Sequence, residues 1–404
     1  MRVVLAAAGI LCAGSAFAGP PPGQSAYLRG AHDREAASWM KTATTATACD
    51  RGWITDLQYI GVGGSPTIDC HDADVAAGIS YLQRLDASGS EPIPHDPAKA
   101  ASFGAGFAAA VGKCPNLHVW IVGNEPNVGW GADVETTSTA NAAAYAEVHK
   151  AVHAVAGHAS DLVLLAPDSP YSPACICSLH RAIQKSKARG VKPDGYAVHA
   201  YTQAQRAADL PGMTALVTSE AMSGSNDACG YPFHWQFRIY RDWIKAIEAE
   251  GEGGAPVFLT ESGNACAPEA GNNCYPDQDL GYFAALWKEA ADWNSTATTK
   301  IRAITPTDGR KTTTERAVIS RLVRAQSCFQ ICRRRSTRSR AGRRLRPAAR
   351  PRGIAPTTTI ARERRSATSG RASARRPSRA RAPRGSSVDR APTTVFQNRA
   401  GSRR

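Results

Sequence analysis

The sequence predicts an α/β fold, a (β/α)8 barrel followed by a basic C-terminal tail, and three observations favour it. Short runs rich in β-branched and apolar residues alternate with Ala-rich stretches that suit helices, which is typical of parallel α/β folds. Eight such runs fit into about 285 residues, enough for eight strand–helix units. Polar residues gather after the carboxyl ends of these runs, where barrels of this kind carry their functional side chains.

Each expected element follows from these patterns in chain order. The expected strands lie at 26–32, 56–62, 78–85, 118–124, 161–167, 195–201, 256–262 and 300–305. The expected helices lie at 97–112, 139–156, 179–189, 234–250 and 279–293. A doubly wound sheet is the alternative, but no Gly-x-Gly-x-x-Gly phosphate loop follows the first strand. We therefore predict one barrel over residues 19–306.

Residues 1–18 are expected to be a signal peptide and not part of the fold. One Arg precedes an apolar run, and Ala16-Phe17-Ala18 matches a small-residue cleavage site. The run is too short for a transmembrane helix, and no later stretch qualifies. We expect a secreted or periplasmic protein, in which disulfide bonds can form.

The predicted barrel contains an even number of cysteines, which in an exported chain indicates disulfide bonds. They are residues 49, 70, 114, 175, 177, 229, 266 and 274. Cys266 and Cys274 close a short loop and are the first expected pair, and Cys49–Cys70 is the second. The cysteines of Cys175-Ile-Cys177 cannot easily bridge to each other, so each is expected to pair elsewhere. No Cys-x-x-Cys pair suggests metal ligation instead.

Residues 307–404 differ sharply in composition from the preceding chain. They hold 28 of the 49 basic residues but only four of the 34 acidic ones, and they contain no Trp or Tyr. Such a segment cannot bury a core and is predicted to be disordered. An Arg-rich tail could bind nucleic acid or an anionic surface through counterion release. Aromatic residues to stack on bases are nearly absent, so nucleic acid is not the expected partner.

Two glutamates end apolar strands and pose the main chemical question. Glu125 lies in "HVWIVGNEPNVGWG" and Glu261 in "PVFLTESGNAC". Burying a glutamate costs free energy, so a buried glutamate is expected either to pair with another polar or charged group or to have a function. Two carboxyl groups facing each other across a barrel rim suit glycoside hydrolysis, where one protonates the leaving oxygen and the other attacks or activates water. A separation of about 5–5.5 Å indicates retention of configuration, and ~6.5–9.5 Å indicates inversion.

Asn124-Glu125-Pro126 after the fourth expected strand and Thr260-Glu261-Ser262-Gly263 in the seventh resemble the motifs of clan A glycoside hydrolases, in a cellulase-like layout. The resemblance implies a (β/α)8 enzyme that cleaves β-linked glycans with retention. It implies that Glu125 is the acid/base, that Glu261 is the nucleophile and that Asn124 hydrogen-bonds the sugar 2-hydroxyl. His199 and Tyr201 resemble positions that line the subsite and orient the nucleophile, and Arg84 is a further candidate.

The remaining candidate residues could have structural roles instead of functional ones. Trp130 could stack on a sugar ring or belong to the core. His149, His153 and His158 fall on or just after an Ala-rich helix and are expected to be solvated or structural, not zinc ligands. We expect no cofactor and no metal, an oligo- or polysaccharide as partner, no membrane contact, and a monomer. A catalytically silent carbohydrate-binding barrel is the alternative to an enzyme.

The resemblance breaks at the eighth strand, after which clan A enzymes commonly place a Trp beneath the sugar. Here no Trp follows residue 293. With suitable codons, reading from the last base of the Pro306 codon gives Tyr-Arg-Trp in place of Thr307-Asp308-Gly309. We therefore hypothesise that residues 307–404 are a frameshifted product, which would leave the eighth strand–helix unit incomplete.

Overall fold

The computed structural model describes residues 24–26, 28–32, 34–42, 51–63, 67–128, 133–170, 174–203, 215, 217–265 and 282–307. The chain divides into two units, Met1–Arg344 and Leu345–Arg404, and all described residues belong to the first. The expected signal peptide and the tail after Thr307 lie outside the described residues, so both stay predictions. No helix among the described residues is long and apolar enough to cross a membrane.

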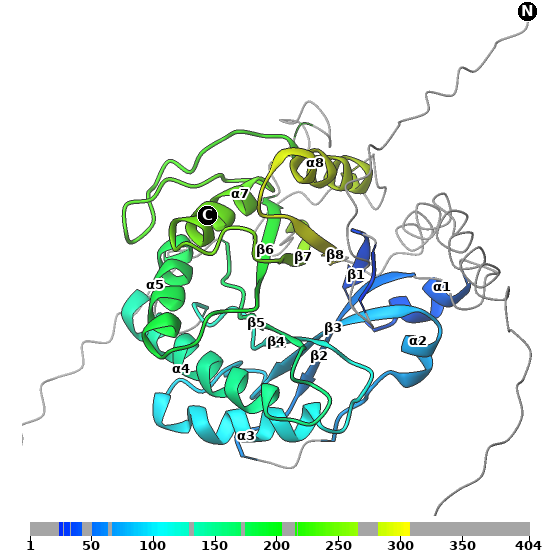
Figure 1. Ribbon diagram of the computed structural model, residues 1–404. Helices are drawn as coiled ribbons and strands as arrows, with labels where there is room; N and C mark the ends of the chain where they lie inside the picture. The colour runs from blue at the N-terminus through cyan, green and yellow to red at the C-terminus, as the bar shows by residue number, and fades with distance from the viewer. Residues whose placement is uncertain are drawn as a thin grey trace, which may run out of the picture. The chain divides into compact units, whose positions relative to one another are not determined.

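Eight parallel strands follow one another around a barrel in chain order (Figure 1). They are β1 Gly30–His32, β2 Gly52–Tyr59, β3 Ile79–Asp86, β4 Val119–Val122, β5 Leu162–Leu165, β6 Gly195–Gln203, β7 Val257–Ala265 and β8 Ile301–Pro306. A parallel bridge between Arg29 and Ile304 joins the last strand to the first. Each predicted strand overlaps an observed one, so the barrel prediction is confirmed and the doubly wound alternative is wrong.

Helices surround the strands on the outside of the barrel (Figure 1). They are α1 Ala36–Thr42, α2 Asp72–Ala76, η1 Pro97–Lys99, α3 Ala100–Val111, α4 Val134–His153, α5 Cys175–Ala188, α7 Ile239–Ala249 and α8 Tyr282–Thr296. The five predicted helices are present, although their starts are shifted. Helix α4 begins before its predicted start because the Asp133 side chain accepts hydrogen bonds from the amides of Glu135 and Thr136.

Two apolar layers hold the barrel together. Trp120 in β4 packs edge-on against Phe107 of α3, in the layer between strands and helices. Its neighbours Val119 and Ile121 point the other way, into a separate interior cluster. That interior cluster consists of Trp53, Leu82, Val119, Ile121, Leu164, Ala197, Phe258 and Ala303. Because strand side chains alternate, the residues two positions beyond this cluster point into the mouth of the barrel at its carboxyl end.

The disulfide pairing differs from the predicted one. Cys70 pairs with Cys114, across a Cα–Cα distance of 5.0 Å, so the expected Cys49–Cys70 pair is wrong. Helix α3 brings its C-terminal end beside the start of α2, which sequence spacing alone did not indicate. Cys177 pairs with Cys229, whereas Cys175 is buried and free, contrary to the expectation that both would be bridged. The expected Cys266–Cys274 pair lies outside the described residues.

Candidate functional site

Glu125 and Glu261 come together at the carboxyl end of the barrel, with His199 between them. Glu125 follows β4, His199 lies in β6 and Glu261 lies in β7. One carboxylate oxygen of each glutamate and one ring nitrogen of His199 all lie within 4.8 Å of one another. The two carboxyl groups are therefore close enough to act on the same bond of a bound molecule.

The backbone after β4 directs Glu125 toward this position. Gly123 has φ +78°, and a Cβ there would lie 2.3 Å from Cγ2 of Ile93, so only glycine fits. Glu125 itself has φ +41°, an uncommon conformation for a non-glycine residue. Its amide donates to the carbonyl of Pro167 after β5 at 2.8 Å, which holds the turn in place.

A register shift in β7 places Glu261 inside the barrel. Ala197 of β6 pairs with Phe258, and both belong to the interior cluster. With regular alternation the next inward residue of β7 would be Thr260. The register shifts between Val198 and His199, so that His199 pairs with Glu261. The extra residue in β7 acts as a β-bulge that turns the carboxylate, instead of a hydroxyl, toward the mouth.

Glu261 is surrounded by hydrogen-bond donors and positive charge. Arg84 Nη1 donates to Oε1 at 2.5 Å, and the Tyr201 hydroxyl donates to Oε2 at 2.5 Å. The Nε2 atoms of His32 and His199 lie 3.6 and 3.7 Å from Oε1. Burial by itself opposes ionisation, but His199, His32 and Arg84 outweigh it and hold the pKa of Glu261 well below its ordinary value. Glu261 is therefore a carboxylate over a wide pH range.

Glu125 has a different environment from Glu261. Its Oε1 lies 2.7 Å from Nδ1 of His199, and no arginine or lysine contacts its carboxyl group among the described residues. The side chain of His199 is fully buried, and the indole of Trp243 in α7 donates to its backbone carbonyl at 2.9 Å. His199 is thus a rigid support that contacts Glu125 with one ring nitrogen and faces Glu261 with the other.

Arg84 links the two strand ends. Its Nη1 donates to Oδ1 of Asn124 at 2.8 Å as well as to Glu261. Burial lowers the pKa of Arg84, but Glu261 and Asp86 more than compensate and raise it, so the guanidinium stays charged. The contact fixes the orientation of the Asn124 amide beside Glu125. Because Arg84 already neutralises Glu261, the cluster of Glu125, His199 and Glu261 is a poor site for a metal cation.

Two buried carboxyl groups lie behind the site. Asp86 is raised in pKa to about 7 by burial and by the charge of Glu261, against the influence of Arg84. Asp168, which follows β5, is raised in pKa to about 8 by burial and by the charge of Glu125. Ser178 interacts with Asp168 and lowers its pKa, but this does not offset the effect of burial. Both groups can therefore be uncharged near neutral pH, which limits the negative charge that Glu125 and Glu261 experience.

Of the seven site residues predicted from the sequence, six lie at this end of the barrel and are joined in one network of contacts. They are Arg84, Asn124, Glu125, His199, Tyr201 and Glu261. Trp130 lies outside the described residues. The prediction missed His32 at the end of β1, which contacts Glu261. The position of His32 at the carboxyl end of a strand could have indicated its role. However, the apolar–polar alternation of this strand is too weak to show which residue ends it.

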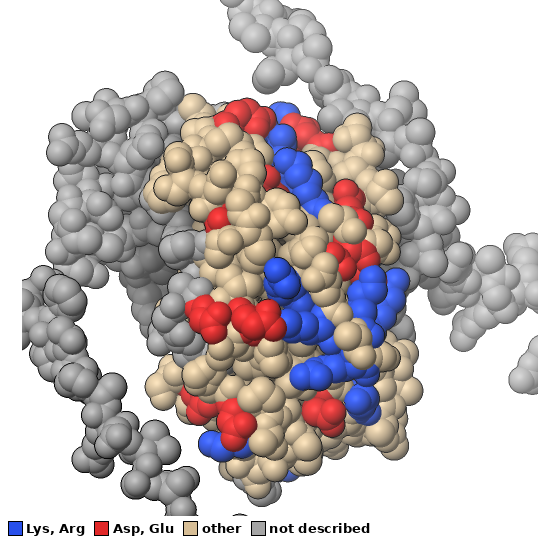
Figure 2. Space-filling view, turned by 90° about the vertical axis from the view of Figure 1, so that its left-hand side faces the viewer, with Lys and Arg blue, Asp and Glu red and all other residues tan. Residues whose placement is uncertain are grey.

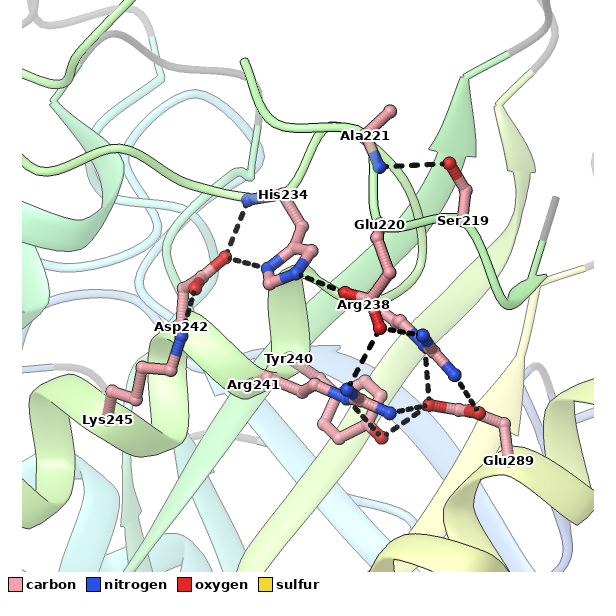
Figure 3. Close-up of polar contacts among 10 residues, drawn as sticks. All are labelled: Ser219, Glu220, Ala221, His234, Arg238, Tyr240, Arg241, Asp242, Lys245 and Glu289. Carbon is pink, nitrogen blue, oxygen red and sulfur yellow. Dashed lines mark hydrogen bonds and ion pairs between the residues drawn. The ribbon is translucent and has the colours of Figure 1, made fainter.

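The segment before α7 is anchored by a second polar network, shown in Figure 3. His234 contacts Asp242 through Nδ1 at 2.7 Å and Glu220 through Nε2 at 2.9 Å. Arg238 also contacts Glu220 and forms two hydrogen bonds to Glu289 of α8. The hydrogen bond to Asp242 raises the pKa of His234, against its burial, with Glu220 adding to the effect. This network ties the β6–α7 connection to two helices and is structural.

Basic side chains gather on the face over α5, with acidic side chains beside them, as Figure 2 shows. Lys185 pairs with Glu135, and Lys187 and Lys192 both pair with Glu252.

Comparisons with known proteins give similar folds at low identity. No protein-family profile matches the chain, and no curated protein matches it. A glucosidase from Croceicoccus marinus is similar over 73% of this chain and 61% of its own, at 13% identity and a TM-score of 0.41. This chain thus spans less than two thirds of that glucosidase.

Two further solved structures are similar over most of their length. One is a curdlan-specific exo-beta-1,3-glucanase of GH128 from Blastomyces gilchristii, with 17% identity over 74% of this chain and 99% of that one, at a TM-score of 0.38. The other is a GH10 protein from Paenibacillus barcinonensis, with 12% identity over 71% and 86% of the two chains, at a TM-score of 0.43.

Proposed function

We propose that the protein is a retaining glycoside hydrolase that cleaves β-linked glycans by double displacement. The observation that carries the proposal is the approach of Glu125 and Glu261, in which one carboxylate oxygen of each lies within 4.8 Å of one of the other. A separation of this size supports the retaining mechanism, because the inverting one needs room for a water molecule between the substrate and its base.

The two glutamates differ in the way that this mechanism requires. Glu261, held ionised by Arg84, Tyr201 and the nearby histidines, attacks the anomeric carbon. Glu125 protonates the departing glycosidic oxygen and then removes a proton from the water that releases the glycosyl group from Glu261. The side chain of Asn124 hydrogen-bonds the sugar 2-hydroxyl. Its contact with Arg84 holds the Asn124 amide in the orientation that this hydrogen bond needs. Apart from the substrate and this water molecule, the reacting groups are the side chains of Glu125 and Glu261.

The experiment is hydrolysis of a panel of aryl β-glycosides and β-glucans by the wild type, Glu125→Gln and Glu261→Gln. Both substitutions should abolish turnover, and the first product seen by NMR should be the β-anomer. The control is Glu252→Gln, the same change at a buried glutamate that pairs with Lys187 and Lys192 away from the site. Full activity in either site variant contradicts the mechanism. Sugar binding without turnover by folded wild type supports a silent carbohydrate-binding barrel.

We further propose that the protein is exported and that residues from Thr307 onward are read out of frame. Two disulfide bonds support export to an oxidising compartment. Resequencing the gene around the Pro306 codon tests the second proposal directly, since an intact reading frame there contradicts it. A chain with the ending restored to Tyr-Arg-Trp should hydrolyse the substrate panel faster than the chain with its present tail.

A further inference from the structure

Contrary to the expectation from the sequence, we propose that His149, His153 and Asp194 form a binding site for a divalent transition-metal ion such as Zn²⁺, remote from the glutamate pair. Each of these residues offers one ligand atom, and these atoms all lie within 4.8 Å of one another. The histidines are one turn apart on α4, and Asp194 directly precedes β6. The cluster therefore lies at the amino end of the strands, opposite Glu125 and Glu261, and the inference does not depend on the proposed function.

The spacing suits a tetrahedral ion. Nε2 of His149 lies 3.2 Å from Oδ1 of Asp194, and Nε2 of His153 lies 2.9 Å from Oδ2. Zinc–ligand bonds of about 2.0–2.2 Å in tetrahedral geometry place neighbouring ligand atoms roughly 3.3 Å apart. Two histidines four residues apart on a helix are also a recurrent zinc-binding arrangement. The two distances are to different oxygens of Asp194, and one ligand atom from each residue lies within 4.8 Å of the other two.

The hydrogen bonds around the cluster orient the ligands. Nδ1 of His153 lies 3.0 Å from the carbonyl oxygen of Ala159, which can only accept, so Nδ1 carries the proton. Metal-binding histidines typically donate their second ring nitrogen to a carbonyl in this way. Asp194 is itself oriented by the amide of Val163, which donates to Oδ2 at 3.1 Å.

An ion can reach this cluster from solvent. The side chains of His149, His153 and Asp194 are between 20% and 23% exposed. They line a surface groove whose other wall includes Gly190–Pro193 and Gly253–Ala255. Of its two lysines, Lys150 pairs with Glu147, and Lys192 shares Glu252 with Lys187. A water molecule or an added ligand could complete the coordination from the groove, because three protein ligands leave one tetrahedral position open.

The other two clusters of this kind among the described residues are less suitable. Asp161 contacts His118 and His158, but its side chain is fully buried and its Oδ2 also accepts from the indole of Trp120. That carboxylate is saturated and has no access to solvent. The cluster of Glu125, His199 and Glu261 already holds the guanidinium of Arg84. Only the cluster at α4 combines open access with a carboxylate that faces two histidines.

The test is titration of the full chain with Zn²⁺ alone and, separately, with Co²⁺, whose visible absorption reports tetrahedral ligation. Wild type should bind one equivalent at this site. His149→Ala and His153→Ala should each weaken that binding by more than about 10–100-fold, the loss that removing an outer-shell partner of a ligand already causes. Zinc should raise the melting temperature of the wild type but not of a variant with both changes. His180→Gln is the control, since His180 is another surface histidine paired with a carboxylate, Glu250.

Three results would overturn the proposal. One is binding that His149→Ala and His153→Ala leave unchanged, which would place the ion elsewhere, for example on the cysteines after residue 307. Another is a cobalt spectrum dominated by thiolate charge transfer in the wild type and in the doubly changed variant alike. The third is the absence of any zinc-dependent rise in melting temperature. Folding of the variants is verified by their melting curves without metal.

Discussion

His199 contacts Glu125 at 2.7 Å through Nδ1 while its Nε2 lies 3.7 Å from Glu261. A single buried ring therefore supports both members of the proposed catalytic pair. Its Nε2 has no hydrogen-bond partner among the described residues, so this nitrogen is available to a substrate hydroxyl or to the charge of Glu261. The side chain couples the position of the acid/base to that of the nucleophile.

Replacing this ring should impair catalysis more than stability. His199→Gln keeps a polar side chain but loses the fixed distance to Glu125, and a misplaced acid/base can cost about 10²-fold in rate. We expect a fall of that order in kcat with a much smaller change in KM, measured on the best substrate of the panel. His180→Gln serves as the control and should leave kcat unchanged. A variant of His199 with wild-type kcat would show that the ring only packs.

Arg84→Met should shift the acidic limb of the pH–rate profile. Arg84 is one of the groups that hold the pKa of Glu261 low, so its removal raises that pKa. A larger share of the nucleophile is then protonated at mildly acidic pH, and the acidic limb of kcat/KM moves to higher pH. Arg84→Lys retains the charge and should move the limb less. Superimposable acidic limbs in all three proteins would contradict the assigned role.

The network at His234 predicts a pH dependence of stability. The pKa of His234 is raised in the folded protein, chiefly by its hydrogen bond to Asp242. Its contribution is fully present below the unfolded-state pKa of about 6.5 and is lost as the pH rises through the higher folded-state value. Urea unfolding at a series of pH values should therefore show a loss over this window in the wild type that His234→Gln lacks. Parallel curves for the two proteins would refute the assignment.

Gly123→Ala tests the turn that carries Glu125. Alanine in a left-handed conformation costs about 1–2 kcal/mol by itself. At Gly123 the overlap with Ile93 should add about 1–3 kcal/mol and displace Glu125, so that kcat falls as well. Gly157→Ala is the matched control, because Gly157 has φ +88° with nothing within 4 Å of its Cβ position. Equal losses of unfolding free energy in the two variants would exclude the overlap.

Most of the strands were predictable because the apolar runs around them are bounded by turn residues. The runs that became β4 and β7 each end on a glutamate, and in a parallel barrel all strand ends share one rim, so the meeting of Glu125 and Glu261 followed from topology. Composition could not show the bulge at Thr260, since it depends on the pairing with β6. Composition also could not predict the disulfide bond between Cys70 and Cys114, because that contact depends on how α2 and α3 pack.

Helix starts were predicted less well for a local reason. Helix α4 begins at Val134, because Asp133 caps it, whereas the Ala-rich pattern starts later. Helix α5 begins at Cys175, within the stretch that was interpreted only through its cysteines. His32 was missed because β1 has only three residues, too few for its alternation to show which side chain faces the mouth.

The central claim is that Glu261 becomes covalently bonded to the sugar, and trapping this intermediate tests it most directly. The protein is incubated with activated 2-deoxy-2-fluoro-β-glycosides, which form the glycosyl-enzyme quickly and release it slowly, and peptides are then analysed by mass spectrometry. We predict one fluoroglycosyl group per chain, attached to the peptide containing Glu261 and absent in Glu261→Gln. Turnover of unmodified substrate by a protein that is never labelled, or a label on another residue, would contradict the account.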